Sequence, residues 1–337
     1  MIKFLKTNLK EVSQNEMDSI YEKIKTPKKA GAVIKWDDYF TDSPTVFKYN
    51  GAFYMYFIAI SKDVSVSGYE THIAKSLNLT DWEYIGPVFR RNDENNWDSK
   101  QIAGYVAFND IDYNGNFEIK AINKKYYISY LAGNSDGYEP DPLFMGLGFG
   151  NNPICADSFK RLKNPILKPD DRDFRPFENK TLYKSCMFVD PKKTTGYPYV
   201  NVYNAKDYDD KERIFLAVSN DALHWERYGE CACLDLISDD ENAIITGDPQ
   251  IIMIDDIYVM LFFRLNKGNP AYNTFACSRD LKNWRVWDGE PLVKSEFEWE
   301  KSHAHKSWFV RNNGVNYHFY CAVNDETKER FIALATS

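Results

Sequence analysis

The stretch from Thr41 to Ile60 reads TDSPTVFKYNGAFYMYFIAI. Two runs of β-branched and aromatic residues flank Asn50-Gly51, and Asn-Gly between such runs is a strong signal for a β-hairpin. An acidic residue, Asp42, stands at the beginning of the first run. The stretch therefore predicts a hairpin whose first strand begins with a carboxylate, and the same pattern returns further along the sequence.

Five units of this kind follow one another. Their expected strand segments are 43–57 with 71–86, 117–133 with 143–150, 185–205 with 213–229, 248–264 with 273–289, and 305–323 with 331–337. Three units end in a Ser-x-Asp/Asn-x-x-x-Trp turn, which begins at Ser76, Ser219 and Ser278. Repeats of roughly 40 to 50 residues with about four strands each are typical of propeller blades. The sequence therefore predicts an all-β fold, a five-bladed β-propeller that extends over residues 31–337.

The first 30 residues differ from the repeats. Ser13 and Glu16 have the spacing of a capping box, and Met17 and Ile20 recur at helical spacing before Pro27 ends the pattern. We expect a short amphipathic helix in this N-terminal extension, packed on the outside of the β-domain.

The fifth unit lacks its outer strand, because the sequence ends at Ser337. A strand-like segment, 31–36, stands at the other end of the sequence and is in the right place to supply the missing strand. Such pairing would also cover a sheet edge.

Composition and charge exclude several classes of protein. The net charge of -7 and the pI of about 5.4 argue against nucleic acid or an anionic membrane surface as a partner. No apolar run is long enough for a signal peptide or a bilayer span, which favours a cytoplasmic or periplasmic protein. The six cysteines form no CxxC pair, so neither a zinc site nor a disulfide framework is expected.

Polar residues begin the innermost strand of each expected blade, where a propeller has its central channel. They are Asp42-Ser43, Glu118 or Asp112, Lys184-Ser185, Asp248 and His305-Lys306. Aspartate at a strand start is also a common turn former. A ring of acids, a lysine and a histidine around one axis nevertheless indicates a functional site.

These features resemble the five-bladed β-propeller glycosidases, above all the family 43 glycoside hydrolases and their relatives, including family 117. The resemblance rests on the hairpin with its aspartate, the repeated Asp-Leu-x-x-Trp turn, Gly247-Asp248-Pro249 and the segment HAHKSW at 303–308. Segments 68–71 and 318–323 are similar to glycosylases of gut bacteria that degrade polysaccharides. The resemblance covers the sequence from about residue 17 onward.

The resemblance implies hydrolysis of a glycosidic bond with inversion, releasing a terminal sugar from a plant or algal oligosaccharide. This reaction needs a carboxylate that activates water and a protonated acid about 6.5–9.5 Å away. By analogy, Asp42 is the expected general base and Glu118 the general acid, while Asp248 orients the sugar and raises the pKa of the acid. A histidine, His303 or His305, and Glu178 are alternative acids.

The expected sugar-binding residues are polar groups near the strand starts and one tryptophan. They are Glu70, Asp112, Lys184, Ser185, His303, Lys306 and Trp308, and further aromatic residues, Trp36, Trp97, Tyr105 and Tyr138, are candidates either for stacking on sugar or for the core. Lysine and histidine side chains also fit an anionic sugar such as a uronate. We expect no cofactor, although some related propellers hold a calcium ion in the channel.

Two other functions fit the same sequence. In an inverting phosphorylase, Lys184, His305, Lys306 or Arg264 would bind phosphate, and the activity would depend on phosphate. A sugar-binding propeller without catalysis would keep its ligand affinity after Asp42→Asn or Asp248→Asn.

Overall fold

The computed structural model describes residues 11–63, 67–155 and 158–337. The first ten residues, on which the expectation about a signal peptide depends, lie outside this part. Helix α1 (Gln14–Ile24) has the predicted capping box, because the backbone N–H of Ser13 donates to Glu16 Oε2 at 2.8 Å and the Ser13 side chain accepts from Glu16. The helix buries Met17, Ile20 and Ile24 against the β-structure, which confirms the predicted amphipathic helix.

Within the described part of the protein, the strands form four sheets. The first contains β2 (Tyr39–Tyr49), β3 (Ala52–Ser61), β4 (Tyr69–Ser76) and β5 (Glu83–Phe89). The second contains β6 (Gln101–Ala107), β7 (Tyr126–Gly133), β8 (Phe144–Gly150) and β9 (Lys160–Arg161). The third contains β1 (Lys28–Ile34), β18 (His303–Asn312), β19 (Val315–Asn324) and β20 (Glu329–Thr336).

The fourth sheet has eight strands. They are β10 (Thr181–Val189), β11 (Tyr199–Lys206), β12 (Glu212–Ser219), β13 (Glu226–Tyr228), β14 (Ala243–Ile254), β15 (Ile257–Asn266), β16 (Tyr272–Ser278) and β17 (Arg285–Val286). The pair Glu212–Ile245 joins its two halves through β12 and β14. A 3-10 helix, η3 (Glu298–Glu300), precedes β18.

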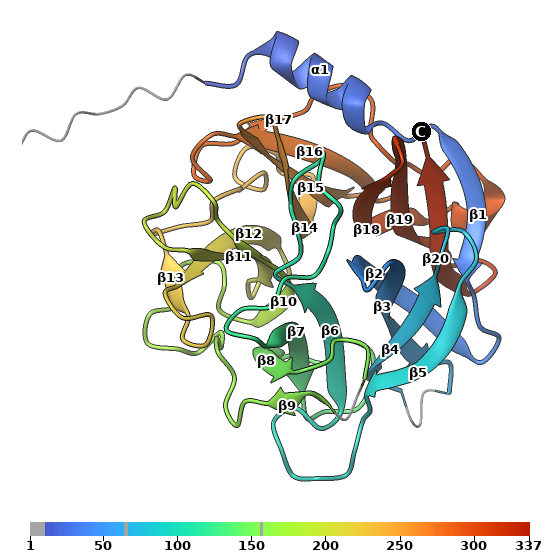
Figure 1. Ribbon diagram of the computed structural model, residues 1–337, viewed down its shortest axis with the longest axis vertical. Coiled ribbons are helices and arrows are strands. Elements are labelled where there is room, and N and C mark those ends of the chain that lie inside the picture. Colours follow the sequence, from blue (N-terminus) through green and yellow to red (C-terminus); the bar gives the residue numbers. More distant parts are fainter. Residues whose placement is uncertain (1–10, 64–66, 156–157) are drawn as a thin grey trace, which may run out of the picture.

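The sheets surround a common centre (Figure 1). Five strands lie next to one another around this centre in the order β2, β6, β10, β14 and β18, and β18 in turn contacts β2. We call them the inner strands. Residues far apart in the sequence therefore face one central space. Among the described residues, no helix has the length and apolar character needed to cross a bilayer.

Strand β1 pairs antiparallel with β20, from Lys28 opposite Thr336 to Ile34 opposite Ile332. The N-terminal segment thus supplies the outer strand of the sheet that contains the C-terminus (Figure 1). This confirms the pairing of the two ends expected from the sequence.

The three serine-to-tryptophan turns share one geometry. In the first turn, the backbone N–H of Leu79 donates to Ser76 Oγ at 2.8 Å, and the Trp82 indole N–H donates to the Leu79 carbonyl at 3.3 Å. In the other two turns, Ala222 and Leu281 take the place of Leu79 and make the same two contacts. All three have a positive φ, between 63° and 69°. The repeated sequence therefore specifies a repeated local structure.

The second sheet corrects one expectation. Its innermost strand is β6 (Gln101–Ala107), whereas residues 117–133 were expected to begin the unit. Two-residue turns join β2 to β3, β14 to β15 and β18 to β19, and residues 190–198 join β10 to β11, but residues 108–125 separate β6 from β7. Within this insertion, Glu118 bridges Lys48 and Ile119 bridges Asn109. The sequence pattern predicted β7 correctly, but the segment before it that was expected to be the inner strand belongs to this insertion.

Candidate active site

Four of the five inner strands carry a β-bulge where the sequence places polar residues. The register shifts lie between Asp42 and Thr45 in β2, Leu182 and Ser185 in β10, Gly247 and Gln250 in β14, and His305 and Trp308 in β18. A bulge adds one residue to a strand and redirects the side chains beside it. These bulges direct polar side chains toward the centre.

The centre contains a cavity of about 160 Å³. Residues from all four sheets and from the connecting loops line it. Its ionisable lining residues are Asp42, Glu139, Lys184, Glu212, Asp248, His303, His305, Lys306 and Arg330, together with Tyr69, Tyr105, Tyr138 and Tyr183. Six of the predicted site residues are therefore brought together here: Asp42, Lys184, Asp248, His303, His305 and Lys306.

Asp42 is buried, and both of its carboxylate oxygens accept hydrogen bonds. Its Oδ1 accepts the backbone N–H of Ser43 at 2.6 Å, and its Oδ2 accepts from Arg330 at 2.9 Å and from Lys306 at 3.3 Å. Burial acts to raise the pKa of Asp42, but the positive charges of Lys306 and Arg330 outweigh it and hold the pKa well below its ordinary value. Asp42 is an ionised carboxylate in the lining of the cavity.

Glu139 lies in the loop between β7 and β8 and was not predicted from the sequence. Its Oε1 lies 3.3 Å from Lys306 Nζ, and a quarter of its side chain is exposed. Burial raises its pKa, but Lys306 and the Tyr69 hydroxyl lower it more, so the net shift is downward. Glu139 is therefore a second ionised carboxylate, and it remains accessible from the cavity.

Glu212, the first residue of β12, was also not predicted. The side chain is buried, and its Oε2 accepts a hydrogen bond from Asn204 Nδ2 at 2.7 Å. Burial raises the pKa of Glu212 to about 8, and the negative charges of Glu139 and Asp248 add to the shift. At neutral pH this carboxyl group holds a proton.

Asp248 and Lys184 form the opposite wall. Lys184 Nζ lies 3.7 Å from Asp248 Oδ2 and donates to the Ser307 carbonyl at 3.3 Å. Burial raises the pKa of Asp248 and lowers that of Lys184. The charge of Lys184 acts to lower the pKa of Asp248, and the charge of Asp248 acts to raise the pKa of Lys184, but burial has the larger effect on both. Asp248 Oδ2 is buried and accepts no hydrogen bond from any residue that the structure describes. Such an atom is available to a ligand hydroxyl.

The two histidines are neutral side chains in the cavity wall. Burial lowers both pKa values, that of His305 well below 6.5. His303 Nδ1 accepts the backbone N–H of Ala271 at 3.1 Å. His305 Nδ1 is buried without a hydrogen-bond partner in the described part of the protein.

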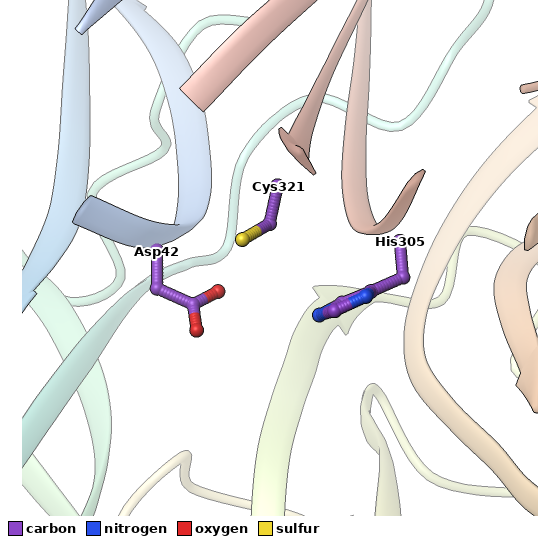
Figure 2. A group of neighbouring side chains, drawn as sticks. All are labelled: Asp42, His305 and Cys321. Carbon is purple, nitrogen blue, oxygen red and sulfur yellow. The ribbon is translucent and has the colours of Figure 1, made fainter. Parts of the chain in front are cut away.

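His305 also belongs to a group of three potential metal ligands. Figure 2 shows Asp42, His305 and Cys321, which come from three different strands, directed toward one space, and their ligand atoms lie within 4.8 Å of one another. Calcium prefers six to eight oxygen ligands, which one carboxylate, one imidazole and one thiol do not supply. The Asp42 oxygens also already bind Lys306 and Arg330. These residues do not fit the calcium ion of some related propellers.

Five predicted site residues do not line the cavity. Glu118 and Asp112 are exposed, and Glu118 accepts from the Asn116 side chain at 3.0 Å. Their predicted placement is wrong because both lie in the insertion between β6 and β7. Glu70 accepts the backbone N–H of Arg91 at 3.0 Å, since its neighbour Tyr69 takes the inward position on β4.

The other two are core residues. Trp308 is fully buried and donates to the Val46 carbonyl at 2.9 Å, and Ser185 is buried beside the bulge that directs Lys184 inward. Of the candidate aromatic residues, Tyr105 and Tyr138 line the cavity, but Trp36 and Trp97 pack against the core.

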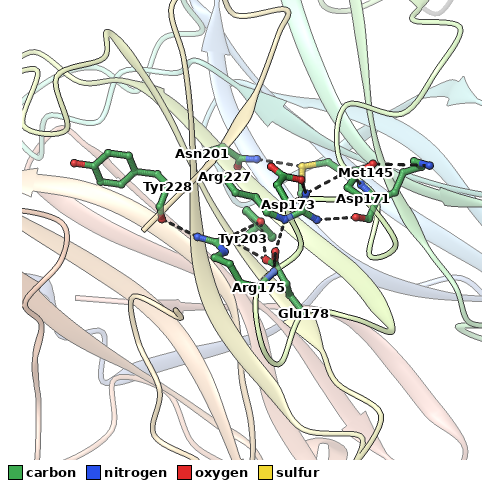
Figure 3. Close-up of polar contacts among 10 residues, drawn as sticks. Met145, Asp171, Asp173, Arg175, Glu178, Asn201, Tyr203, Arg227 and Tyr228 are labelled. Atoms are coloured by element: carbon green, nitrogen blue, oxygen red, sulfur yellow. Dashed lines mark hydrogen bonds and ion pairs between the residues drawn. The ribbon is translucent and has the colours of Figure 1, made fainter. Parts of the chain in front are cut away.

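Glu178, the alternative acid, belongs to a structural network outside the cavity. Figure 3 shows that Arg175 and Arg227 converge on it, and the Tyr203 hydroxyl donates to its Oε2 at 3.0 Å. Arg227 also reaches Asp173 at 2.9 Å. With both oxygens bound and no exposed surface, Glu178 anchors the loop before β10 rather than meeting a substrate.

Comparison with known proteins now identifies the family. A structure described as "Glycoside hydrolase" superimposes with a TM-score of 0.90, at 35% sequence identity over 97% of this protein and 96% of the other. This protein belongs to the glycoside hydrolases. A structure described as a complex of BT0996 with RGII matches with the same identity, coverage and TM-score. No protein-family model and no curated protein sequence matches.

More distant glycoside hydrolases share the propeller fold. A thermostable family 43 glycoside hydrolase superimposes with a TM-score of 0.64 at 18% identity, over 90% of this protein and 91% of the other. Similar likenesses are found to a family 117 enzyme of Zobellia galactanivorans and to a member of family 130, whose description names both mannoside phosphorylases and glycoside hydrolases. The expected resemblance to propeller glycosidases is confirmed.

Proposed function

We propose that this glycoside hydrolase releases a terminal sugar from an oligosaccharide with inversion, with Glu212 as general acid and Glu139 as general base. The observation that carries the proposal is a pair of carboxyl groups in one cavity with opposite protonation. The pKa of Glu212 is raised to about 8, whereas that of Glu139 is lowered. Divergent pKa values in neighbouring carboxyl groups are the usual mark of an acid and base pair.

Glu212 replaces Glu118 as the acid. A general acid must hold its proton at neutral pH and give it up as the leaving group departs, which a pKa near the working pH allows. Glu212 meets this requirement because burial and the charge of Glu139 disfavour its ionised form. Glu118, by contrast, is exposed outside the cavity.

Glu139 replaces Asp42 as the base. A base needs a free lone pair directed at water, but Asp42 has 2% of its side chain exposed and both oxygens bound. Glu139 is 25% exposed and shares Lys306 with Asp42. Asp42 then has a different role, because its charge holds Lys306 and Arg330 in place beside Glu139.

Two buried polar atoms support sugar binding. Asp248 Oδ2 can accept a sugar hydroxyl, and His305 Nδ1 can accept or donate according to its tautomer. Tyr138, half exposed and bonded to Arg330 through its hydroxyl, offers a ring face at the edge of the cavity. These groups provide hydrogen bonds and stacking for one sugar.

The shape of the cavity supports attack on the end of an oligosaccharide. Its lining includes the buried side chains of Asp42, Lys184 and His305, and we infer that they close one end, so that a sugar enters from the other. Since a similar structure is described as a complex with RGII, we propose a plant cell-wall oligosaccharide as the substrate.

The likeness to family 130 keeps phosphorolysis as the competing reaction. Two observations favour hydrolysis. Arg264, a candidate phosphate ligand, pairs with Asp240 and does not line the cavity. Lys306 and Lys184 already face Asp42, Glu139 and Asp248. The same pairing of lysines with carboxylates disfavours a uronate.

We also infer that the fold is a five-bladed propeller. If the eight-stranded sheet is divided at the pair Glu212–Ile245, the strands fall into five groups of four. The cyclic order of contacts among the five inner strands supports this division.

The experiment measures release of sugar from pectic and other plant oligosaccharides by wild type, Glu212→Gln and Glu139→Gln, with and without phosphate. Both variants should lose at least about 100-fold in kcat, the lower end of what acid–base catalysis contributes. Glu118→Gln is the matched control and should keep wild-type activity. Proton NMR of the first product should show the inverted anomer. Phosphate dependence, a retained anomer or active Glu212→Gln would contradict the proposal.

A further inference from the structure

Asn204 connects two functional elements of the cavity. It lies on β11 and is buried, with 1% of its surface exposed. Its Nδ2 donates to Glu212 Oε2 at 2.7 Å, and its Oδ1 accepts the backbone N–H of Asp248 at 3.2 Å. One amide thus joins the proposed acid on β12 to the bulge on β14.

The orientation of this amide follows from its partners. A backbone N–H can only donate, so the oxygen of the Asn204 amide must face Asp248 and its NH2 group must face Glu212. The NH2 group offers only hydrogens, and Oε2 of Glu212 therefore accepts this hydrogen bond. In a protonated carboxyl group the carbonyl oxygen is a better acceptor than the hydroxyl oxygen, so this contact favours the proton on Oε1.

We propose that Asn204 is a positioning residue that places the acidic proton of Glu212 on Oε1, so that this oxygen alone serves the leaving group. The inference rests on the proposed role of Glu212 as the general acid. In the reaction, Oε1–H gives its proton to the glycosidic oxygen as the bond to the anomeric carbon breaks. The charge left on the carboxylate is shared with Oε2, where the Asn204 N–H stabilises it.

Gly247 provides the space that this arrangement needs. A Cβ atom at Gly247 would lie 2.9 Å from Asn204 Nδ2 and 3.1 Å from the Phe263 ring. Real Cβ atoms essentially never come within 3.0 Å of a neighbour, so the contact with Asn204 would require a shift, and the contact with Phe263 would be tight. The glycine in Gly247-Asp248-Pro249 is therefore explained by the side chain of Asn204, which is neither in the motif nor in its strand.

The charge balance agrees with this role. The hydrogen bond from Asn204 lowers the pKa of Glu212 against the larger effects of burial and of Glu139 and Asp248. Asn204 thus eases loss of the proton while fixing its place. Removing the amide donor should move the alkaline limb of the kcat profile to higher pH and misplace the proton.

Asn204→Asp tests the proposal with little change in shape. The aspartate keeps an oxygen for the Asp248 N–H but has no N–H for Glu212. We expect kcat to fall about 10- to 100-fold for glycosides with poor leaving groups, part of the contribution of general acid catalysis. For dinitrophenyl glycosides, which need no acid, the rate should stay within about two-fold, because that step bypasses the general acid.

Asn204→Ala provides a second variant should Asn204→Asp not fold, and Asn201→Ala is the matched control. Asn201 is buried on the same strand, where it contacts Met145, and it does not line the cavity. The control should show neither the leaving-group dependence nor the shift of the alkaline limb.

Glu212→Gln separates this inference from the function on which it rests. If the loss in Glu212→Gln does not depend on the leaving group, Glu212 is not the acid and both proposals fail. The other case is that the loss of rate in Glu212→Gln depends on the leaving group. If the Asn204 variants then lose rate equally for all leaving groups, or lose none, only the positioning role of Asn204 is refuted.

Discussion

Replacing Glu212 by glutamine should remove a large pH dependence of folding stability. The pKa of Glu212 lies at about 8 in the folded protein, against an ordinary value of 4.5. The folded state therefore binds this proton more tightly than the unfolded state. Its contribution to stability is complete below about pH 4.5 and is lost as the pH rises toward 8.

The size of the effect follows from the same values. Each pH unit between the two pKa values costs about 1.36 kcal/mol, so the full loss is on the order of 5 kcal/mol. Glutamine keeps the shape and can still accept the hydrogen bond from Asn204, but it does not ionise. Between pH 4.5 and 8.5 the variant should lose about 4 kcal/mol less stability than wild type.

Urea unfolding at half-unit pH intervals measures this difference. Other groups titrate over the same range, but they do so in both proteins, and the comparison cancels them. Glu230→Gln, which removes an exposed carboxylate, is the control and should follow wild type. Parallel stability curves for wild type and Glu212→Gln would refute the raised pKa and with it the reason for assigning Glu212 as the acid.

Three further predictions follow from contacts in the structure. Lys306→Met removes the main charge that lowers the pKa of Glu139 against burial, so the acidic limb of the kcat/KM profile should move to higher pH. Lys100→Met, outside the cavity, should leave the profile unchanged. Glu178→Gln breaks a buried ionic network and should cost about 3–5 kcal/mol in urea unfolding, while kcat of the folded enzyme stays near wild type. A strong loss of kcat would give Glu178 a part in catalysis. Ile24→Ala opens a cavity under α1 and should cost about 2–5 kcal/mol, which the same unfolding assay measures. A loss below about 1 kcal/mol would mean that the helix is not docked as described.

Much of the architecture could be predicted because its signals are local. Asn50-Gly51 specifies the first hairpin, and the capping box at Ser13 begins α1 as expected. The expected pairing of β1 with β20 also holds, because an unfinished unit and a lone strand at opposite ends of the sequence can satisfy each other.

The candidate site could be predicted only in part. Asp42, Asp248 and Lys306 were predicted as residues at the beginnings of inner strands. In the structure they lie inside β2, β14 and β18, which begin earlier than expected, and bulges direct them inward. Glu139 and Glu212 carry no such signal, since one lies in a loop and the other begins the third strand of its group.

The sequence by itself determined most of the strands, β6 excepted, and the turns and the repeat, since hairpin, cap and turn preferences act over a few residues. Only the tertiary structure decided which carboxyl groups meet. It placed Glu118 outside and brought Glu139 and Glu212 into one cavity. Protonation there depends on burial and on charges from distant segments, so the roles of acid and base arise from packing rather than from any motif.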